Sequence, residues 1–230
     1  MSAPRVSVVI PALNEAARIE QTLVSTRAYF DSTGLPYELI VVDDGSTDAT
    51  AEIASRNASV VKHKRNSGKG AAVRTGALVS AGEWMLFLDA DLSTKPEAFE
   101  AFLPHLETHD ILFASRRAAT AVIRSAQPAW RNGSGQIFNV LVRHISGLPY
   151  RDTQCGFKAF RMEACRPLFE ALVTTGWAFD VELLVRARHC GLNMLEIPVE
   201  WHHQTGSRVR LSHAPRVLKD LLRVRTITRT

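Results

Sequence analysis

The chain has 230 residues, 46% of them hydrophobic and 22% charged, with a formal net charge of +5. This composition is that of a globular protein and excludes an intrinsically disordered chain, and the length suits one sizeable domain. From Arg208 to the end there are seven basic residues and one acid, whereas a nucleic-acid binder usually spreads its basic residues over the fold, so we expect no nucleic-acid partner.

Apolar runs typical of strands alternate with amphipathic runs typical of helices in the first half of the chain. The expected strands cover residues 6–10, 39–42, 60–61, 85–88 and 111–114. The expected helices lie near residues 19–30, 49–56, 70–81 and 96–106. This alternation predicts an α/β fold, with a mostly parallel sheet flanked by helices in a single domain.

The second half is less regular. We expect a loop over 116–132 that contains four arginines, a helix over 137–145 and a polar turn from Asp152 to Lys158. A helix over 179–189, a strand over 194–199 and a final helix over 217–224 complete the prediction. In the final helix, Leu218, Leu221 and Leu222 form an apolar stripe. Packing on the domain and binding to an anionic membrane surface explain that stripe equally well.

Polar motifs follow three of the expected strands. They are Pro11 to Glu15, Asp43-Asp44-Gly45-Ser46 and Asp89-Ala90-Asp91. Ligands of open α/β sheets bind beyond the carboxyl ends of the strands, so we expect these motifs to meet at one edge. Two carboxylates in an Asp-x-Asp motif point the same way on an extended chain and suit Mg²⁺, which also takes substrate phosphate and water. A turn capped by Asp91 is the alternative interpretation.

Two further motifs have a simpler structural explanation beside the functional one. The carboxylates of Asp43 and Asp44 can accept hydrogen bonds from a nucleoside, with Gly45 at positive φ, but the segment also fits a plain strand–turn–helix connection. The two interpretations are compatible. The loop from Asn66 to Gly70 is similar to a phosphate cradle, yet on its own a helix-entry loop is the better interpretation.

The arginines and acids of the second half complete the candidate site. We expect Arg117 and Arg131 to hold a phosphate, and Arg124 to be solvated. Asp180 and Glu182 are two positions apart on a helix and face different ways, so we expect only one of them to reach the site, as a base or as an orienter of a basic residue.

In this order, the motifs resemble the inverting family 2 glycosyltransferases of the GT-A fold. The donor-side resemblance lies in residues 11–15, 43–46, 69–70 and 89–93. The runs 115–117, 152–158, 179–183 and 196–201 resemble dolichyl-phosphate β-glucosyltransferases and their bacterial polyprenyl-phosphate relatives. The Gln-x-x-Arg-Trp signature of processive members is missing from the sequence, which argues against cellulose or chitin synthesis.

The resemblance implies transfer of a sugar from a nucleotide-diphosphate sugar to a polyprenyl or dolichyl phosphate, with inversion and with Mg²⁺ or Mn²⁺ as cofactor. UDP-glucose is the preferred donor, and UDP-N-acetylhexosamine and GDP-mannose remain open. The resemblance also implies Asp89 and Asp91 as metal ligands, and Arg117 and Arg131 beside Asp91 in catalysis. The implied nucleotide-sugar site consists of Pro11, Asn14, Glu15, Asp43, Asp44, Lys69, Asp89 and Ala90.

Two alternatives remain. A hydroxyl acceptor on a soluble sugar or protein would need a carboxylate base, for which Asp180 and Glu182 are the candidates. A non-catalytic module that binds nucleotide or a membrane surface is the weaker alternative.

The organisation and location follow from the same features. We expect a glycosyltransferase domain over 1–211, with a donor half over 1–115 and an acceptor half over 116–211, and then a basic amphipathic helix over 212–230. No apolar run reaches the roughly 18 residues of a membrane span, and the N-terminus lacks a signal-peptide pattern. Three cysteines without a Cys-x-x-Cys pair fit free thiols. We therefore expect a cytoplasmic protein associated peripherally with the inner face of the membrane; the sequence leaves the oligomeric state open.

Overall fold

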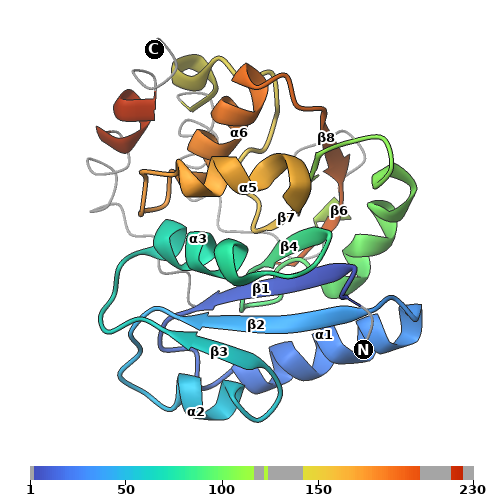
Figure 1. Ribbon diagram of the computed structural model, residues 1–230, viewed down its shortest axis with the longest axis vertical. Coiled ribbons are helices and arrows are strands. Elements are labelled where there is room, and N and C mark those ends of the chain that lie inside the picture. The colour runs from blue at the N-terminus through green and yellow to red at the C-terminus, as the bar shows by residue number, and fades with distance from the viewer. Residues whose placement is uncertain (1–2, 117–121, 124–141, 203–218, 225–230) are drawn as a thin grey trace.

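The computed structural model describes residues 3–116, 122–123, 142–202 and 219–224. A seven-stranded sheet runs through this part of the chain, with helices on both faces (Figure 1). The strands are β1 Val6–Ala12, β2 Tyr37–Asp43, β3 Ser59–Lys62, β4 Trp84–Leu88, β5 Ile111–Ser115, β6 Val122–Ile123, β7 Phe157–Arg161, β8 Met194–Pro198 and β9 Glu200–Trp201. The helices are α1 Ile19–Thr33, α2 Thr50–Ala54, α3 Lys69–Val79, α5 Met162–Glu170 and α6 Phe179–His189, with 3₁₀ helices η1 Pro96–Ala101 and η2 Leu103–His105. Residues 142–146 and 219–224 are also helical.

The strand order confirms the predicted α/β class with a mostly parallel sheet. The order is β3-β2-β1-β4-β7-β5-β8, and β7 runs antiparallel to both of its neighbours, whereas the other pairs are parallel. β6 and β9 form a separate parallel pair. The sequence did not predict β7, because its first two residues belong to the expected polar turn and the charged Lys158 interrupts its apolar pattern.

Further elements differ from the prediction. The two-residue strand β6 lies within the segment 116–132, which was expected to be a loop, because pairing with the distant β9 forms it. The helix expected over 96–106 is a pair of 3₁₀ helices, and Pro104 explains the break because it lacks an N–H and disfavours helical geometry in the residue before it. Helix α5 was not predicted, since Pro167 lies inside it. The bounds expected for α6 are confirmed.

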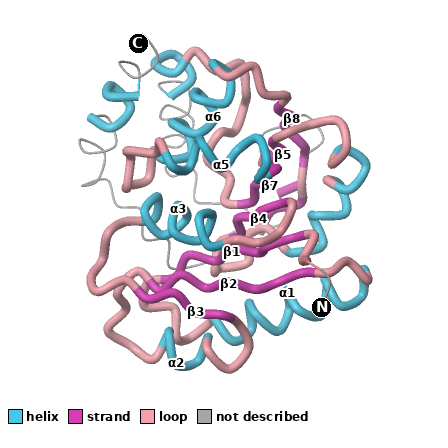
Figure 2. The backbone as a smooth tube through the Cα atoms, in the orientation of Figure 1, coloured by secondary structure: helices cyan, strands magenta, loops and turns pink. Residues whose placement is uncertain are grey.

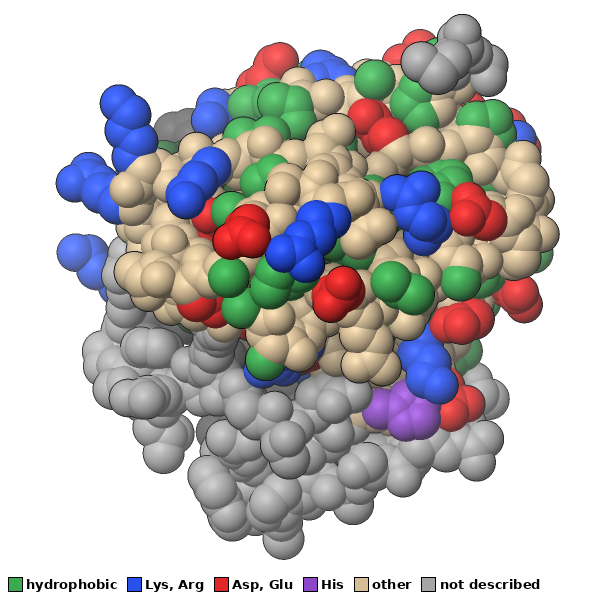
Figure 3. Space-filling model, turned by 90° about the horizontal axis from the view of Figure 1, so that it is seen from below, with side chains coloured by type: hydrophobic (Ala, Val, Ile, Leu, Met, Phe, Trp, Pro, Cys, Tyr) green, Lys and Arg blue, Asp and Glu red, His purple; other side chains and the backbone are tan. Residues whose placement is uncertain are grey.

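The core lies on both faces of the sheet, as expected for strands that read as continuous apolar runs. Along β1, Val8 and Ile10 pack on the side of α1 and η1, whereas Val9 packs on the side of α3, α5 and α6. The two helical layers are visible on either side of the strands (Figure 2). On the face that carries α1 and α2, acidic and basic side chains are interspersed (Figure 3).

The helical segment 219–224 joins the core on the side of α3 and α6. Leu221 and Val224 are buried there, whereas Leu222 is half exposed. Leu221 therefore packs on the domain, and Leu218 lies outside the described residues. No helix in the described part of the chain is long and apolar enough to span a membrane. The three cysteines are free thiols, as predicted.

Candidate active site

The parallel register brings the three acidic and polar motifs to one edge of the sheet. Ala12 at the end of β1 lies opposite Asp43 at the end of β2, and the Asp44 N–H donates to the Ala12 carbonyl over 2.8 Å. β4 pairs with β1 on its other side, and Asp89 follows its last residue. The expected meeting of these motifs at the carboxyl ends of the strands is therefore confirmed.

Asp89 is held in place from two directions. Its backbone N–H donates to the Gly156 carbonyl over 3.0 Å, and its Oδ1 lies 2.6 Å from Nζ of Lys69. A Cβ added at Gly156 would lie 1.8 Å from Asp89 Oδ2. Position 156 thus requires glycine so that the Asp89 carboxylate can occupy its place.

The Ala90–Asp91 segment forms a tight turn beside Asp89. Oδ1 of Asp91 accepts a hydrogen bond from the Ser93 N–H at 2.9 Å, and Leu92 has φ +52°. The Ala90 carbonyl accepts a 2.7 Å hydrogen bond from the buried Thr22 hydroxyl of α1. The capped turn is therefore present, and non-glycine residues at positive φ are typical of functional sites.

The donor set of this turn fits a hard divalent cation. Asp89 and Asp91 offer carboxylate oxygens, which Mg²⁺ and Mn²⁺ prefer. Within the described residues, no group of three or more His, Cys, Asp or Glu side chains is arranged to hold a metal. A cation at this turn would therefore take its remaining ligands from phosphate and water, as Mg²⁺ commonly does.

The carboxylate of Asp44 organises the loop that leads into α3. It accepts hydrogen bonds from Nδ1 of His63 at 2.7 Å and from the backbone N–H groups of Ser67 and Gly68 at 2.9 and 2.8 Å. The ring of His63 also contacts the Thr75 hydroxyl through Nε2, at 2.9 Å. Asp44 is 4% exposed. These contacts fit a loop-holding carboxylate better than the expected direct contact with a nucleoside.

Asp43 has more capacity for a ligand. Its Oδ1 accepts the Ser46 N–H at 2.9 Å, which is the expected turn, and Gly45 has φ +78° as predicted. Its Oδ2 is buried, has no hydrogen-bond partner within the described residues, and lies 3.9 Å from Nζ of Lys62. A buried acceptor without a donor is costly, so Oδ2 of Asp43 is the atom in this pair that a ligand donor would satisfy.

The loop after β1 is tied to the loop after β2. Asn14 has φ +50°, its N–H donates to the Ser46 hydroxyl, and its side-chain oxygen accepts the Thr47 N–H, both at 2.8 Å. Oε2 of Glu15 lies 2.7 Å from Nε of Arg18. Pro11 lies within β1, at its carboxyl end. The expected nucleotide-side residues are thus adjacent.

Two backbone N–H groups at the start of α3 are already hydrogen-bonded within the protein. The N–H groups of Gly70 and Ala71 donate to the Thr175 carbonyl over 2.8 and 3.3 Å. A Cβ at Gly68 would lie 2.3 Å from that same oxygen. The phosphate-cradle interpretation is therefore wrong for these two N–H groups, and the segment is a helix-entry loop.

Two lysines and two aspartates form a cluster behind the turn. Lys158 is fully buried and donates to Asp180 Oδ1 at 3.0 Å and to the Cys155 carbonyl at 2.5 Å. Burial raises the pKa of Asp180, and the positive charges of Lys158 and Lys69 only partly offset this. Burial would lower the pKa of Lys69, but the carboxylates of Asp89 and Asp180 outweigh it and raise the pKa. The cluster keeps Lys69 charged at the edge of the site.

Glu182 faces away from this cluster, as expected for a residue two positions from Asp180. Its carboxylate accepts the N–H groups of Val173 and Thr174 at 3.1 and 2.8 Å, and Nε of Arg186 at 2.8 Å. The side chain is fully buried. Glu182 therefore holds the segment that precedes Thr175.

Arg116 is paired with Asp152 inside the fold. Its Nε and Nη2 donate to the two oxygens of Asp152 at 2.7 and 2.9 Å. Burial would raise the pKa of Asp152, but the Arg116 guanidinium outweighs burial and lowers this pKa to about 2. Arg117, Arg124 and Arg131 lie outside the described residues. Sequence reasoning did not assign Lys158, Gly156 or Asp152 a place in the site, although it singled out the run that contains them.

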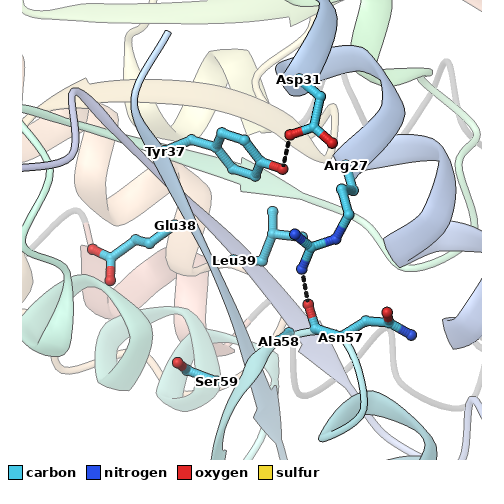
Figure 4. A pocket seen from close by; sticks show the side chains of 8 residues that line it. All are labelled: Arg27, Asp31, Tyr37, Glu38, Leu39, Asn57, Ala58 and Ser59. Carbon is cyan, nitrogen blue, oxygen red and sulfur yellow. Dashed lines mark hydrogen bonds between the residues drawn. The ribbon is translucent and has the colours of Figure 1, made fainter. Parts of the chain in front are cut away.

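A hollow elsewhere on the surface lies far from the acidic motifs. Residues of α1 and of the first halves of β2 and β3 line it, including Arg27, Asp31 and Tyr37 (Figure 4). The Tyr37 hydroxyl donates to Asp31 at 2.6 Å, and Arg27 donates to the Asn57 carbonyl at 2.6 Å. Because it lies at the amino ends of the strands, this hollow is at the opposite edge from the acidic motifs.

Known proteins are similar to this chain in sequence and in fold. The glycosyl transferase family 2 profile matches residues 7–169. A dolichyl-phosphate beta-glucosyltransferase of Trichomonas vaginalis is 35% identical over 94% of this chain and 69% of its own length. The Saccharomyces cerevisiae protein of that name is 33% identical over 95% and 73%. The structure of glucosyl-3-phosphoglycerate synthase from Mycobacterium tuberculosis, in complex with Mn²⁺, UDP-glucose and phosphoglyceric acid, is 24% identical with a TM-score of 0.73, over 97% of this chain and 80% of that one.

Proposed function

This chain belongs to glycosyl transferase family 2, and on that premise we propose that it transfers glucose from UDP-glucose to a dolichyl or other polyprenyl phosphate, with inversion at the anomeric carbon. The observation that carries the proposal is the turn of Asp89 and Asp91 beside Lys69, at the carboxyl ends of the strands. This turn occurs in a chain that aligns almost throughout with dolichyl-phosphate beta-glucosyltransferases.

The donor side of the proposal assigns roles to residues at the edge of the sheet. Asp89 and Asp91 hold Mg²⁺ or Mn²⁺, which when bound offsets the negative charge that develops on the departing diphosphate. Oδ2 of Asp43, which has no hydrogen-bond donor within the described residues, accepts a hydrogen bond from the uracil or ribose, and Asp44 keeps the neighbouring loop in place. Lys69 adds positive charge beside the diphosphate.

The acceptor side of the proposal needs no base. A phosphate monoester has a second pKa of roughly 6 and is largely dianionic at neutral pH, so its oxygen is a ready nucleophile. That oxygen bonds to the anomeric carbon from the face opposite the diphosphate, and the bond from this carbon to the UDP oxygen breaks. Arg117 and Arg131 hold the acceptor phosphate in line for this attack.

A hydroxyl acceptor has weaker support. It would require Asp180 or Glu182 as a base. Asp180 is enclosed and bound by Lys158, and Glu182 is bound by two backbone N–H groups and Arg186. We also propose that residues 1–211 form the body of the transferase domain, onto which the helical segment 219–224 packs through Leu221 and Val224. The basic side chains of 212–230 would then bring the domain to the surface of the membrane that holds the lipid acceptor.

The test is a screen of nucleotide sugars by nucleotide release, with and without polyprenyl phosphate and with Mg²⁺ or Mn²⁺. We expect UDP release from UDP-glucose that depends on both lipid and metal, with a β-linked product by NMR. Asp91→Ala should abolish transfer, and Arg131→Ala should raise KM for the lipid. Failure to move labelled sugar from any donor to the lipid would sink the proposal. Activity that Asp180→Asn abolishes but Arg131→Ala leaves intact would indicate a hydroxyl acceptor.

A further inference from the structure

The side chain of Lys69 is held by one carboxylate and two aromatic rings. Its Nζ lies 2.6 Å from Asp89 Oδ1, 5.0 Å from the ring centroid of Phe87 and 5.1 Å from that of Trp177. The side chains of Lys69 and Asp89 are 19% and 30% exposed, so a ligand can reach the pair from solvent.

The backbone beneath this side chain is fixed. Lys69 is the first residue of α3, and the next two N–H groups are bound by the Thr175 carbonyl. Gly68 and Gly70 are both packed so closely on residues 174–176 that neither tolerates a Cβ. Any movement at this point is therefore a rotation of the Lys69 side chain.

The ion pair of Lys69 and Asp89 conflicts with binding of a divalent cation by Asp89. Asp89 is proposed as a ligand of the divalent cation, yet one of its oxygens is already hydrogen-bonded to an ammonium group. A divalent cation and the ammonium group repel each other and compete for the same carboxylate. The two ring faces stabilise an ammonium group without using a carboxylate oxygen, so Lys69 keeps favourable contacts when it leaves Asp89.

We propose that Lys69 is an exchangeable counter-ion, which neutralises Asp89 in the ligand-free protein, releases it when a divalent cation binds, and then turns its ammonium group to the diphosphate of the donor. The inference rests on the proposed function in taking the metal and the diphosphate as ligands. It predicts effects of opposite sign when the lysine is removed. A cation alone should bind more tightly, and the nucleotide diphosphate should bind less tightly.

The experiment measures Mn²⁺ binding by the EPR signal of the free ion, and UDP binding in saturating Mn²⁺ by calorimetry. For Lys69→Met we expect Mn²⁺ alone to bind about tenfold more tightly (about 1.4 kcal/mol), and UDP to bind about tenfold more weakly. Lys64→Met is the matched control, because it removes the same charge from an exposed position of the preceding loop, and it should change neither constant by more than about twofold. Mn²⁺ affinity that is unchanged, weakened or unmeasurable in Lys69→Met overturns the inference.

Trp177 supplies a second readout of the exchange. Because the ammonium group lies over its ring, release of Lys69 should alter its emission, so Mg²⁺ should change the fluorescence of the unmodified protein but not of Lys69→Met or Trp177→Phe. An equal Mg²⁺ response in Lys69→Met would contradict the exchange. Should Lys69→Met fail to fold, Lys69→Gln serves in its place. Lack of sugar transfer with both binding effects intact would refute the proposed function and leave the counter-ion exchange standing.

Discussion

Replacing Gly156 by alanine tests the way in which the fold positions the Asp-x-Asp turn. The new Cβ would lie 1.8 Å from Oδ2 and 2.2 Å from Cγ of Asp89, and Cβ contacts under 3.0 Å are essentially never seen. The Asp89 carboxylate would have to move by more than about 1 Å, which separates it from Lys69. A misplacement of about 1 Å in an active site can reduce the rate about a hundredfold.

The stability cost of Gly156→Ala should be smaller than its effect on activity. Overpacking of this kind costs about 1–3 kcal/mol, and the partly exposed Asp89 carboxylate can move aside. We therefore expect a folded protein with a lowered melting temperature, a kcat/KM reduced about a hundredfold, and weaker Mn²⁺ binding. Thermal unfolding, a UDP-release assay and the EPR signal of free Mn²⁺ measure these three quantities.

Gly191→Ala separates the two effects. Gly191 has φ +70° and open space around its Cβ position, so alanine there costs about 1 kcal/mol of strain without touching the site. This variant should lose stability and keep its activity. If Gly156→Ala retained the kcat/KM and Mn²⁺ affinity of the unmodified protein, the argument that the glycine positions Asp89 would be wrong.

Three further predictions concern buried contacts. The pKa of Asp152 is lowered from 3.8 to about 2, so its pair with Arg116 should stabilise the fold by about 2 kcal/mol above pH 4, and this stabilisation should be lost as the pH falls through 2. Asp152→Asn should therefore flatten the acid part of a plot of the free energy of urea unfolding against pH. An unchanged slope would contradict the pairing. Glu182→Ala should lower the free energy of unfolding in urea by about 3 kcal/mol, because it leaves two backbone N–H groups and Arg186 without their acceptor. Glu182→Gln should lower it less, and equal losses would argue against the carboxylate's role. Leu221→Ala should lower the free energy of unfolding by about 2–4 kcal/mol, because Leu221 is buried. Leu222 is half exposed, so Leu222→Ala should leave the melting temperature nearly unchanged and weaken binding to anionic vesicles in a flotation assay. Vesicle binding that Leu222→Ala leaves unaffected would count against a membrane-facing surface on this helix.

The sequence by itself determined the order of strands and helices in the first half and the edge at which the acidic motifs meet. These features depend on local patterns: apolar runs mark the strands, helical spacing marks α1, and parallel strands present their carboxyl ends together. The bounds of α6 could be predicted for the same reason. The family resemblance also rested on short motifs that are continuous in the sequence.

Only the tertiary structure decided how the site is held. β7 enters the sheet antiparallel between β4 and β5, which places Gly156 against Asp89. The same strand buries Lys158 beside Asp180, while Thr175 closes the start of α3. Each contact joins residues far apart along the chain, and its partners carry no local pattern that identifies them. Pairing across such distances is chosen by packing and charge neutralisation in the folded core, so it could not be predicted from sequence spacing.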